Sequence, residues 1–195
     1  MGMEFYKVEP TLDNYWRAII LFGRNVASYK FALAKSLYEL NAVSDDLITL
    51  EQLAEPFSHH ICDHLKHAPK QATSSSSKFL ETCCGYNNGS LSQDELIQQT
   101  MKLGFVNVID AFHNVNSGEI DHRFFIDERR THKGIRITDN FFKLAEHEQF
   151  NNFESETEAR WRLVEEGWKL GVSRKLIKVE YDRDLEVLFT TDKER

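Results

Sequence analysis

ARWRLVEEGWKLGVSRKLIKVEYDRDLEVLFTTDKER, residues 159–195, predicts a helix, a stop and two strands in direct succession. Ser155 and Glu158 form a capping-box pattern just upstream, and Gly171 is the expected helix end. The two strands are expected at residues 176–181 and 185–190. Since this strand pair runs out into charged residues at the end of the sequence, we interpret it as the boundary before a further module.

The residues before this stretch have the element order of a winged-helix unit. Ser92 and Glu95 form another capping-box pattern, and Asp139 is placed to cap a helix that runs to residue 150. Two helices and two strands are expected at residues 92–103, 105–115, 122–127 and 134–138. Helix, helix and a two-stranded hairpin with a charged turn together indicate a winged helix.

The N-terminal part is predicted to be helical, over residues 11–41 and 46–67. Gly23 and Pro56 are the positions where these helices are expected to kink or break. The segment APKQATSSSSK, residues 68–78, has nothing to bury and is the best linker candidate. The predicted fold class is therefore α+β, mainly α. We expect two parts: residues 1–73 form a helical part, and residues 78–195 form a winged-helix-like unit that ends in a helix and a β-hairpin. The alternative is that the two parts form one integrated domain.

The composition is that of a globular chain with enough apolar material for a core. Of 195 residues, 41% are hydrophobic, and no run approaches the roughly 18 apolar residues of a membrane span. The start carries no pattern of a secretory signal, and three cysteines make no disulfide framework, so we expect a cytoplasmic protein and no membrane partner. The net charge of −7 argues against DNA binding unless positive charge gathers on one face.

Positive charge does gather in the turn of the predicted hairpin. Mobile cationic side chains on a protruding element are what phosphate contacts require. The candidates for these contacts are Arg129, Arg130, Lys133 and Arg136. The alternative is a solvated turn that keeps an edge strand soluble.

The helix expected at residues 105–115 is the candidate recognition helix. Asparagine pairs bidentately with adenine, but no arginine is present to read guanine, so a plain surface helix is the favoured alternative. The polar positions are Asn107, Asp110, His113 and Asn114.

A second candidate contact lies in the first helical segment. Arg24, Asn25 and Lys30 follow the break expected at Gly23, where free backbone amides and cations could hold an anion. Helix capping and ordinary amphipathicity explain the same residues, and spacing alone favours that alternative.

The histidines of SHHICDHLKH are the metal-ligand candidates of the sequence. His60, His64 and His67 lie along one side of the predicted helix, but a zinc site needs a third or fourth ligand from elsewhere. We therefore favour a polar helix surface and assign no metal site. No zinc-protease, Walker, nucleophile-elbow or Rossmann pattern occurs, so no catalytic residue and no cofactor is assigned to this chain.

Three blocks carry a resemblance to a known family: residues 15–40 with LFGRNVASYKFALAKSL, 124–146 with GIRITDNFFKLAE, and 150–191 with the stretch quoted first. The chain resembles the region before the nuclease module in bacterial HNH endonuclease-type proteins. None of that module's cysteines or metal-binding histidines can be assigned here, so the resemblance implies a divalent metal only for the module that this sequence lacks. It implies that this region recognises or positions double-stranded DNA in restriction or defence, and it strengthens both sets of phosphate-contact candidates.

The alternative function is a non-catalytic protein-interaction or dimerisation module of a defence or regulatory assembly, with a homodimer as the simplest case. The acidity and the weak recognition helix favour it. Trp161 or Trp168 would anchor such an interface if exposed, although a place in the core is the simpler expectation.

Overall fold

The computed structural model describes residues 4–22, 27–41, 45–74, 76–115, 118–171, 178–182, 184–185 and 187–191. The described helices are α1 Leu12–Arg17, α2 Tyr29–Leu40, α3 Leu50–His67, α4 Lys78–Asn87, α5 Gln93–Gln99, α6 Val108–Ala111, α7 Asp139–Ala145 and α8 Phe150–Leu170, with π-helical turns η1 Ala18–Phe22 and η2 Thr100–Gly104. The described strands are β1 Glu4–Val8, β2 Leu47–Thr49, β3 Asn114–Val115, β4 Gly118–Glu119, β5 Phe125–Glu128, β6 Gly134–Ile137, β7 Lys178–Asp182 and β8 Val187–Thr191. The predicted fold class, α+β and mainly α, is confirmed.

Local capping sets several helix ends. Ser92 Oγ accepts a hydrogen bond from Glu95 N (3.3 Å), and Glu95 Oε2 accepts one from Ser92 N (2.8 Å), which confirms the predicted capping box of α5. A second box, between Thr49 and Gln52, starts α3. Gly171 has a φ of 66° after α8, the left-handed conformation that glycine adopts without strain and that ends the helix where predicted.

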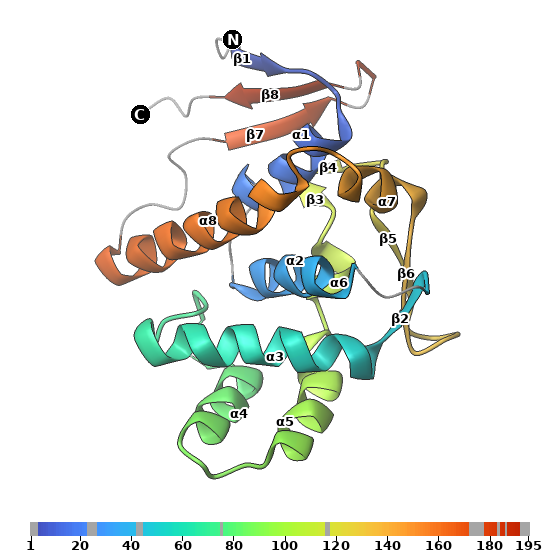
Figure 1. Cartoon of the computed structure of the whole chain (residues 1–195). Helices are drawn as coiled ribbons and strands as arrows, with labels where there is room; N and C mark the ends of the chain where they lie inside the picture. Colours follow the sequence, from blue (N-terminus) through green and yellow to red (C-terminus); the bar gives the residue numbers. More distant parts are fainter. Residues whose placement is uncertain are drawn as a thin grey trace.

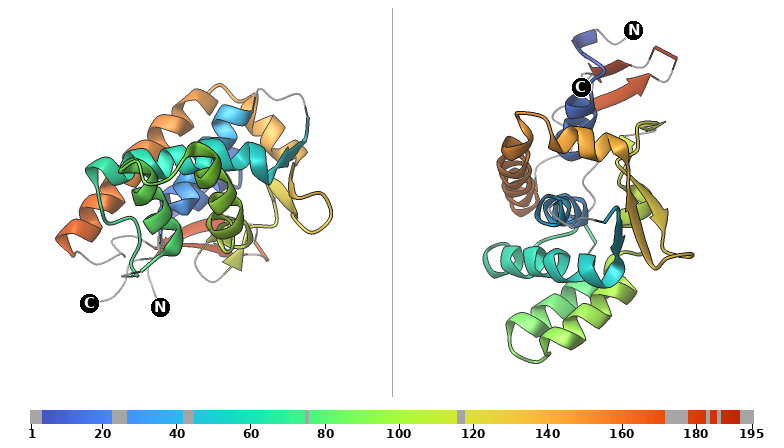
Figure 2. Two further views of the ribbon diagram at one scale, coloured as in Figure 1. Left: turned by 90° about the horizontal axis from the view of Figure 1, so that it is seen from below. Right: turned by 45° about the vertical axis from the view of Figure 1, so that its right-hand side comes forward.

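The helices form successive layers. α8, α2 and α3 lie one below the other in Figure 1, and α4 and α5 lie beneath α3; Figure 2 shows the same order from a second side. Trp16 on α1 is 1% exposed, and its ring centroid lies 5.0 Å from that of Phe124 and 5.5 Å from that of Phe141. Because each such ring buries a large apolar area, aromatic packing of α1 on the β5–α7 region joins distant parts of the chain.

Short antiparallel sheets complete the fold. β2 pairs with β6, and β6 pairs with β5, so the predicted hairpin gains a third strand from the N-terminal part. Gly134 opposes Thr49 in this sheet, and a Cβ built on Gly134 would lie 2.2 Å from Ile48 O, so only glycine allows the strands to approach this closely. β1 and β8 pair beside β7 in a second sheet. The division into residues 1–73 and 78–195 remains a prediction. Two contacts cross this boundary: β2 pairs with β6, and α2 packs on α8.

The recognition-helix prediction is wrong in length. Instead of a helix over residues 105–115, the chain forms the four-residue α6 and then turns into β3. Phe105, Ile109 and Phe112 are all buried, and the His113 ring is also buried, with Nε2 accepting a hydrogen bond from Phe124 N (3.0 Å). Burial lowers the pKa of His113 to about 3, so the ring stays neutral and serves the core.

The linker prediction is wrong in one respect, because residues 68–78 do bury side chains. Gln71 is 1% exposed, and its Nε2 donates to Ala68 O (2.9 Å) and to Glu165 Oε1 (2.7 Å). Ala72 is also buried, 6% exposed. A segment without apolar periodicity is therefore fixed between α3 and α8 by amide hydrogen bonds.

Other boundaries differ from the predicted ones. α3 continues through Pro56, because Leu53 before it and Phe57 after it are both fully buried in the same core. α8 begins at Phe150, ahead of the pattern that starts at Ser155, because aromatic packing extends the helix beyond its local cap signal. β1, β2 and α4 were not predicted. The expected kink at Gly23 lies outside the described residues.

Candidate phosphate-binding site

The β5–β6 turn, residues 129–133, projects from the body of the protein, as Figure 1 shows. Arg129 is nevertheless held inward. Its Nε donates to Asp127 Oδ1, its Nη1 to Phe105 O and its Nη2 to Asp110 Oδ1, each over 2.8 Å. The contacts with Asp127, first, and with Asp110 raise the pKa of Arg129, and all three contacts occupy the donors that a phosphate would need.

Arg136 is paired in the same way. Its Nε donates to Glu128 Oε1 (2.8 Å), its Nη2 to Glu128 Oε2 (3.0 Å) and its Nη1 to Asp46 Oδ1 (2.8 Å). The pair with Arg136 lowers the pKa of Glu128. Arg136 thus ties β6 to β5 and to the residue before β2.

Arg130 and Lys133 are the cations of the turn that remain available. Both are exposed, and within the described part of the chain neither lies at ion-pair distance from a carboxylate. Lys133 adopts a φ of 55°, and its carbonyl oxygen accepts a hydrogen bond from Leu50 N (2.8 Å), so the tip of the turn is fixed to the start of α3. Two of the four predicted turn contacts are therefore free to meet a phosphate.

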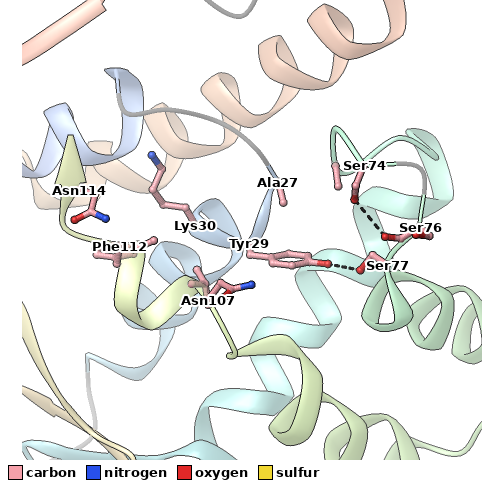
Figure 3. Close-up of a pocket in the computed structure, with 12 residues that line it drawn as sticks. Ala27, Tyr29, Lys30, Ser74, Ser76, Ser77, Asn107, Phe112 and Asn114 are labelled. Atoms are coloured by element: carbon pink, nitrogen blue, oxygen red, sulfur yellow. Dashed lines mark hydrogen bonds between the residues drawn. The ribbon is translucent and has the colours of Figure 1, made fainter. Parts of the chain in front are cut away.

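The second predicted contact leads to a pocket. Arg24 and Asn25 lie outside the described residues, but Lys30 is described at the start of α2 and is only 8% exposed. It lines a pocket of about 490 Å³ between α2, the segment before α4, and α6 with its flanking residues. In the view of Figure 3, the Lys30 side chain rises between Asn114 and Ala27.

Lys30 has no anionic partner within the described residues. Burial, and next the nearby Arg160, lower the pKa of Lys30 to about 7. Arg160, on α8, has a buried Nε without a hydrogen-bond partner among those residues, and burial also lowers its pKa. Burying Lys30 without an anion, near the half-buried Arg160, costs free energy that a bound anion would recover.

The polar lining of the pocket comes from residues that the sequence assigned elsewhere. Asn107 and Asn114, expected on the recognition helix, lie here with Lys30, and neither side-chain amide has a hydrogen bond to a described residue. Tyr29 Oη and Ser77 Oγ share a hydrogen bond of 2.7 Å at the opposite wall (Figure 3). The structure therefore brings two separate sets of candidates together.

Arg160 was missed by the sequence analysis. Thr157 and Trp161, its neighbours on α8, are buried, which places Arg160 at the flank of a buried face. The signal was a cation beside an apolar helical stripe, and it is a weak one because long cations commonly extend from such flanks to water.

The histidine side of α3 forms a buried network with α8. His64 Nδ1 contacts Glu165 Oε1, and His64 Nε2 lies 3.2 Å from Glu158 Oε2. The His64 ring stacks on Trp161 with centroids 3.4 Å apart, while Lys35 Nζ also donates to Glu158 (2.8 Å). His60 contacts a different carboxylate, and His67 is exposed, so the three predicted histidines do not converge. No group of three or more metal-ligand side chains is found among the described residues.

No protein-family model, curated protein or solved structure matches the chain. None of the helices in the described ranges has the length and apolar character needed to cross a lipid bilayer.

Proposed function

We propose that this chain binds duplex DNA through phosphate contacts, as the target-recognition region of an HNH endonuclease-like restriction or defence protein of the cytoplasm. The observation that carries the proposal is Lys30, which is 8% exposed, lines an open pocket and has no carboxylate partner among the described residues, with the half-buried Arg160 near it. In a chain of net charge −7, such local departures from charge pairing mark where an anion is accommodated. The resemblance of the three sequence blocks to HNH-associated regions points to DNA as the source of that anion.

The free cations of the β5–β6 turn supply a second contact. Arg130 and Lys133 are exposed and belong to a turn anchored to α3, so they can meet a backbone phosphate with little ordering of the main chain. Arg129 and Arg136 support the turn and are not proposed as phosphate ligands, because carboxylates of the protein already bind them.

Fluorescence anisotropy of a labelled duplex of about 25 base pairs, at several salt concentrations, tests this function. We expect affinity to fall as salt rises. The double variant Arg130→Ala/Lys133→Ala should lower the salt slope by up to about 2. The matched control is Lys66→Ala/Lys169→Ala, which removes the same charge from exposed lysines paired with their own carboxylates. No binding at low salt refutes the function, and equal losses in both double variants refute this site.

The alternative function, a protein-interaction module, is not supported by the two tryptophans that would have anchored such an interface. Trp161 is 0% and Trp168 is 7% exposed, so both belong to the interior, as the simpler expectation held.

A further inference from the structure

We propose that the pocket beside Lys30 binds one nucleoside phosphate unit, with the phosphate on Lys30 and the base against the wall formed by Tyr29 and Asn107. This inference rests on the proposed function, since it names the part of the DNA that enters the pocket. The unit is either a nucleotide turned out of a duplex or a free nucleotide, and the chemistry of recognition is the same for both.

The position of the cation decides how DNA would reach it. Lys30 is 92% buried, whereas the phosphates of a stacked duplex lie on a convex surface. A phosphate can approach a buried ammonium group only if its nucleotide leaves the regular backbone path. Extrusion of a nucleotide into a pocket is a known solution to this geometry, with the unstacking of the base as its energetic cost.

The size and lining of the pocket suit a nucleotide better than a bare anion. Its volume of about 490 Å³ falls within the range of small-molecule sites, while a phosphate alone would occupy only the end near Lys30. The half-buried Tyr29 supplies aromatic surface against which a base can pack. Asn107 and Asn114 present amides that lack hydrogen bonds to described residues, and an asparagine amide matches the donor and acceptor of adenine.

Arg160 adds a second positive charge near Lys30. It lies close enough to Lys30 to lower the lysine's pKa, and its buried Nε is unpartnered within the described ranges. A dianionic terminal phosphate or a backbone phosphodiester would offset the repulsion between the two cations. A neutral nucleoside would leave that repulsion in place, so the phosphate is required for binding.

The first arm of the test uses small probes. Binding of deoxyadenosine monophosphate, deoxyadenosine and inorganic phosphate is measured by titration calorimetry with the full chain. We expect the monophosphate to bind at least roughly tenfold more tightly than either fragment. Lys30→Met should weaken this binding by tenfold or more and the exposed Asn107→Ala by about fivefold, while Lys66→Ala leaves it unchanged. Equal affinity for inorganic phosphate and the monophosphate overturns the nucleotide assignment.

The second arm uses a duplex with 2-aminopurine opposite a mismatch, where unstacking costs least. A rise in emission on binding that Lys30→Met abolishes supports a nucleotide turned out of the duplex. Duplex binding without an emission change, together with no monophosphate binding, overturns the inference and leaves the proposed function standing. Monophosphate binding that depends on Lys30, in a chain that binds no duplex, supports the pocket with a free nucleotide as its ligand and refutes the proposed function.

Discussion

Replacing Lys30 by methionine is expected to stabilise the protein, although it removes the central cation of the candidate site. The lysine is 8% exposed and unpaired within the described residues, so folding transfers a charged amine out of water without a compensating anion. Methionine has a similar length and no charge, and it can fill the same space against α8 and α6. Since the fold gains no stability from this charge, we assign the charge to the binding of a ligand.

The magnitude follows from the two protonation equilibria. The pKa of Lys30 is about 7 in the folded protein and 10.5 in an ordinary exposed lysine. Because the folded-state pKa is depressed, the unfolded chain binds more protons between these values, and stability rises with pH across that window. Each pKa unit corresponds to ~1.4 kcal/mol. The charge of Lys30 therefore lowers the free energy of unfolding by at most about 4 kcal/mol at pH 7 and by about 2 kcal/mol at pH 9, and this loss disappears above pH 10.5.

Urea unfolding of both proteins at pH 7, 8 and 9 measures this effect. The methionine variant should be more stable at each pH, and its advantage should shrink by about 2 kcal/mol from pH 7 to pH 9. Taking the difference between the two proteins cancels the titration of all other groups. An advantage that stays constant with pH would show that Lys30 is not a buried charge in the folded state, and the argument for an anion site would fall with it.

Two further changes test the contacts that position the site. Gly134→Ala should lower the free energy of unfolding, measured in urea, by about 3 kcal/mol or more, since the new Cβ would lie 2.2 Å from Ile48 O. Gly167→Ala on α8, where nothing lies within 4 Å of the new Cβ, should raise the free energy of unfolding by ~0.5–1 kcal/mol. Similar effects of the two changes would contradict the close approach of β2 and β6. Glu165→Ala should lower the free energy of unfolding by about 3 kcal/mol because it leaves buried donors unpaired. The same change at the adjacent, exposed Glu166 should alter the free energy of unfolding by less than ~0.5 kcal/mol. A small effect at both positions would contradict a structural role for the buried network.

The parts of the fold that depend on local chemistry could be predicted from the sequence. The Ser92–Glu95 capping box, the helix stop at Gly171 and the hairpin of β5 and β6 all follow from neighbouring residues. The capping box depends on a hydroxyl that accepts from a free backbone amide, and the helix stop depends on a residue in the left-handed conformation. Both causes act over a few positions of the chain.

The parts that depend on distant contacts could not be predicted. Arg129 and Arg136 look like free cations in the sequence, but the carboxylates that bind them include Asp110, 19 residues away, and Asp46, 90 residues away. Gln71 looks like a linker residue, yet Trp161 Nε1 donates to its side-chain oxygen across a separation of 90 residues. Charge pairing and polar burial are decided by tertiary neighbours, and a single sequence carries no record of which these are.

The pairing of β1 with β8 has a consequence for the order of folding. Glu4 faces Thr191 and Val8 faces Leu188, so this sheet joins two strands that are far apart in the sequence and are therefore synthesised at different times on the ribosome. The helices can form contacts as they emerge, but β1 has no partner until β8 is released, and a long chain loop must then close. We expect this three-stranded sheet to form after the helical layers between its strands, and β1 to remain an unpaired strand, open to nascent-chain chaperones, until β8 has been synthesised.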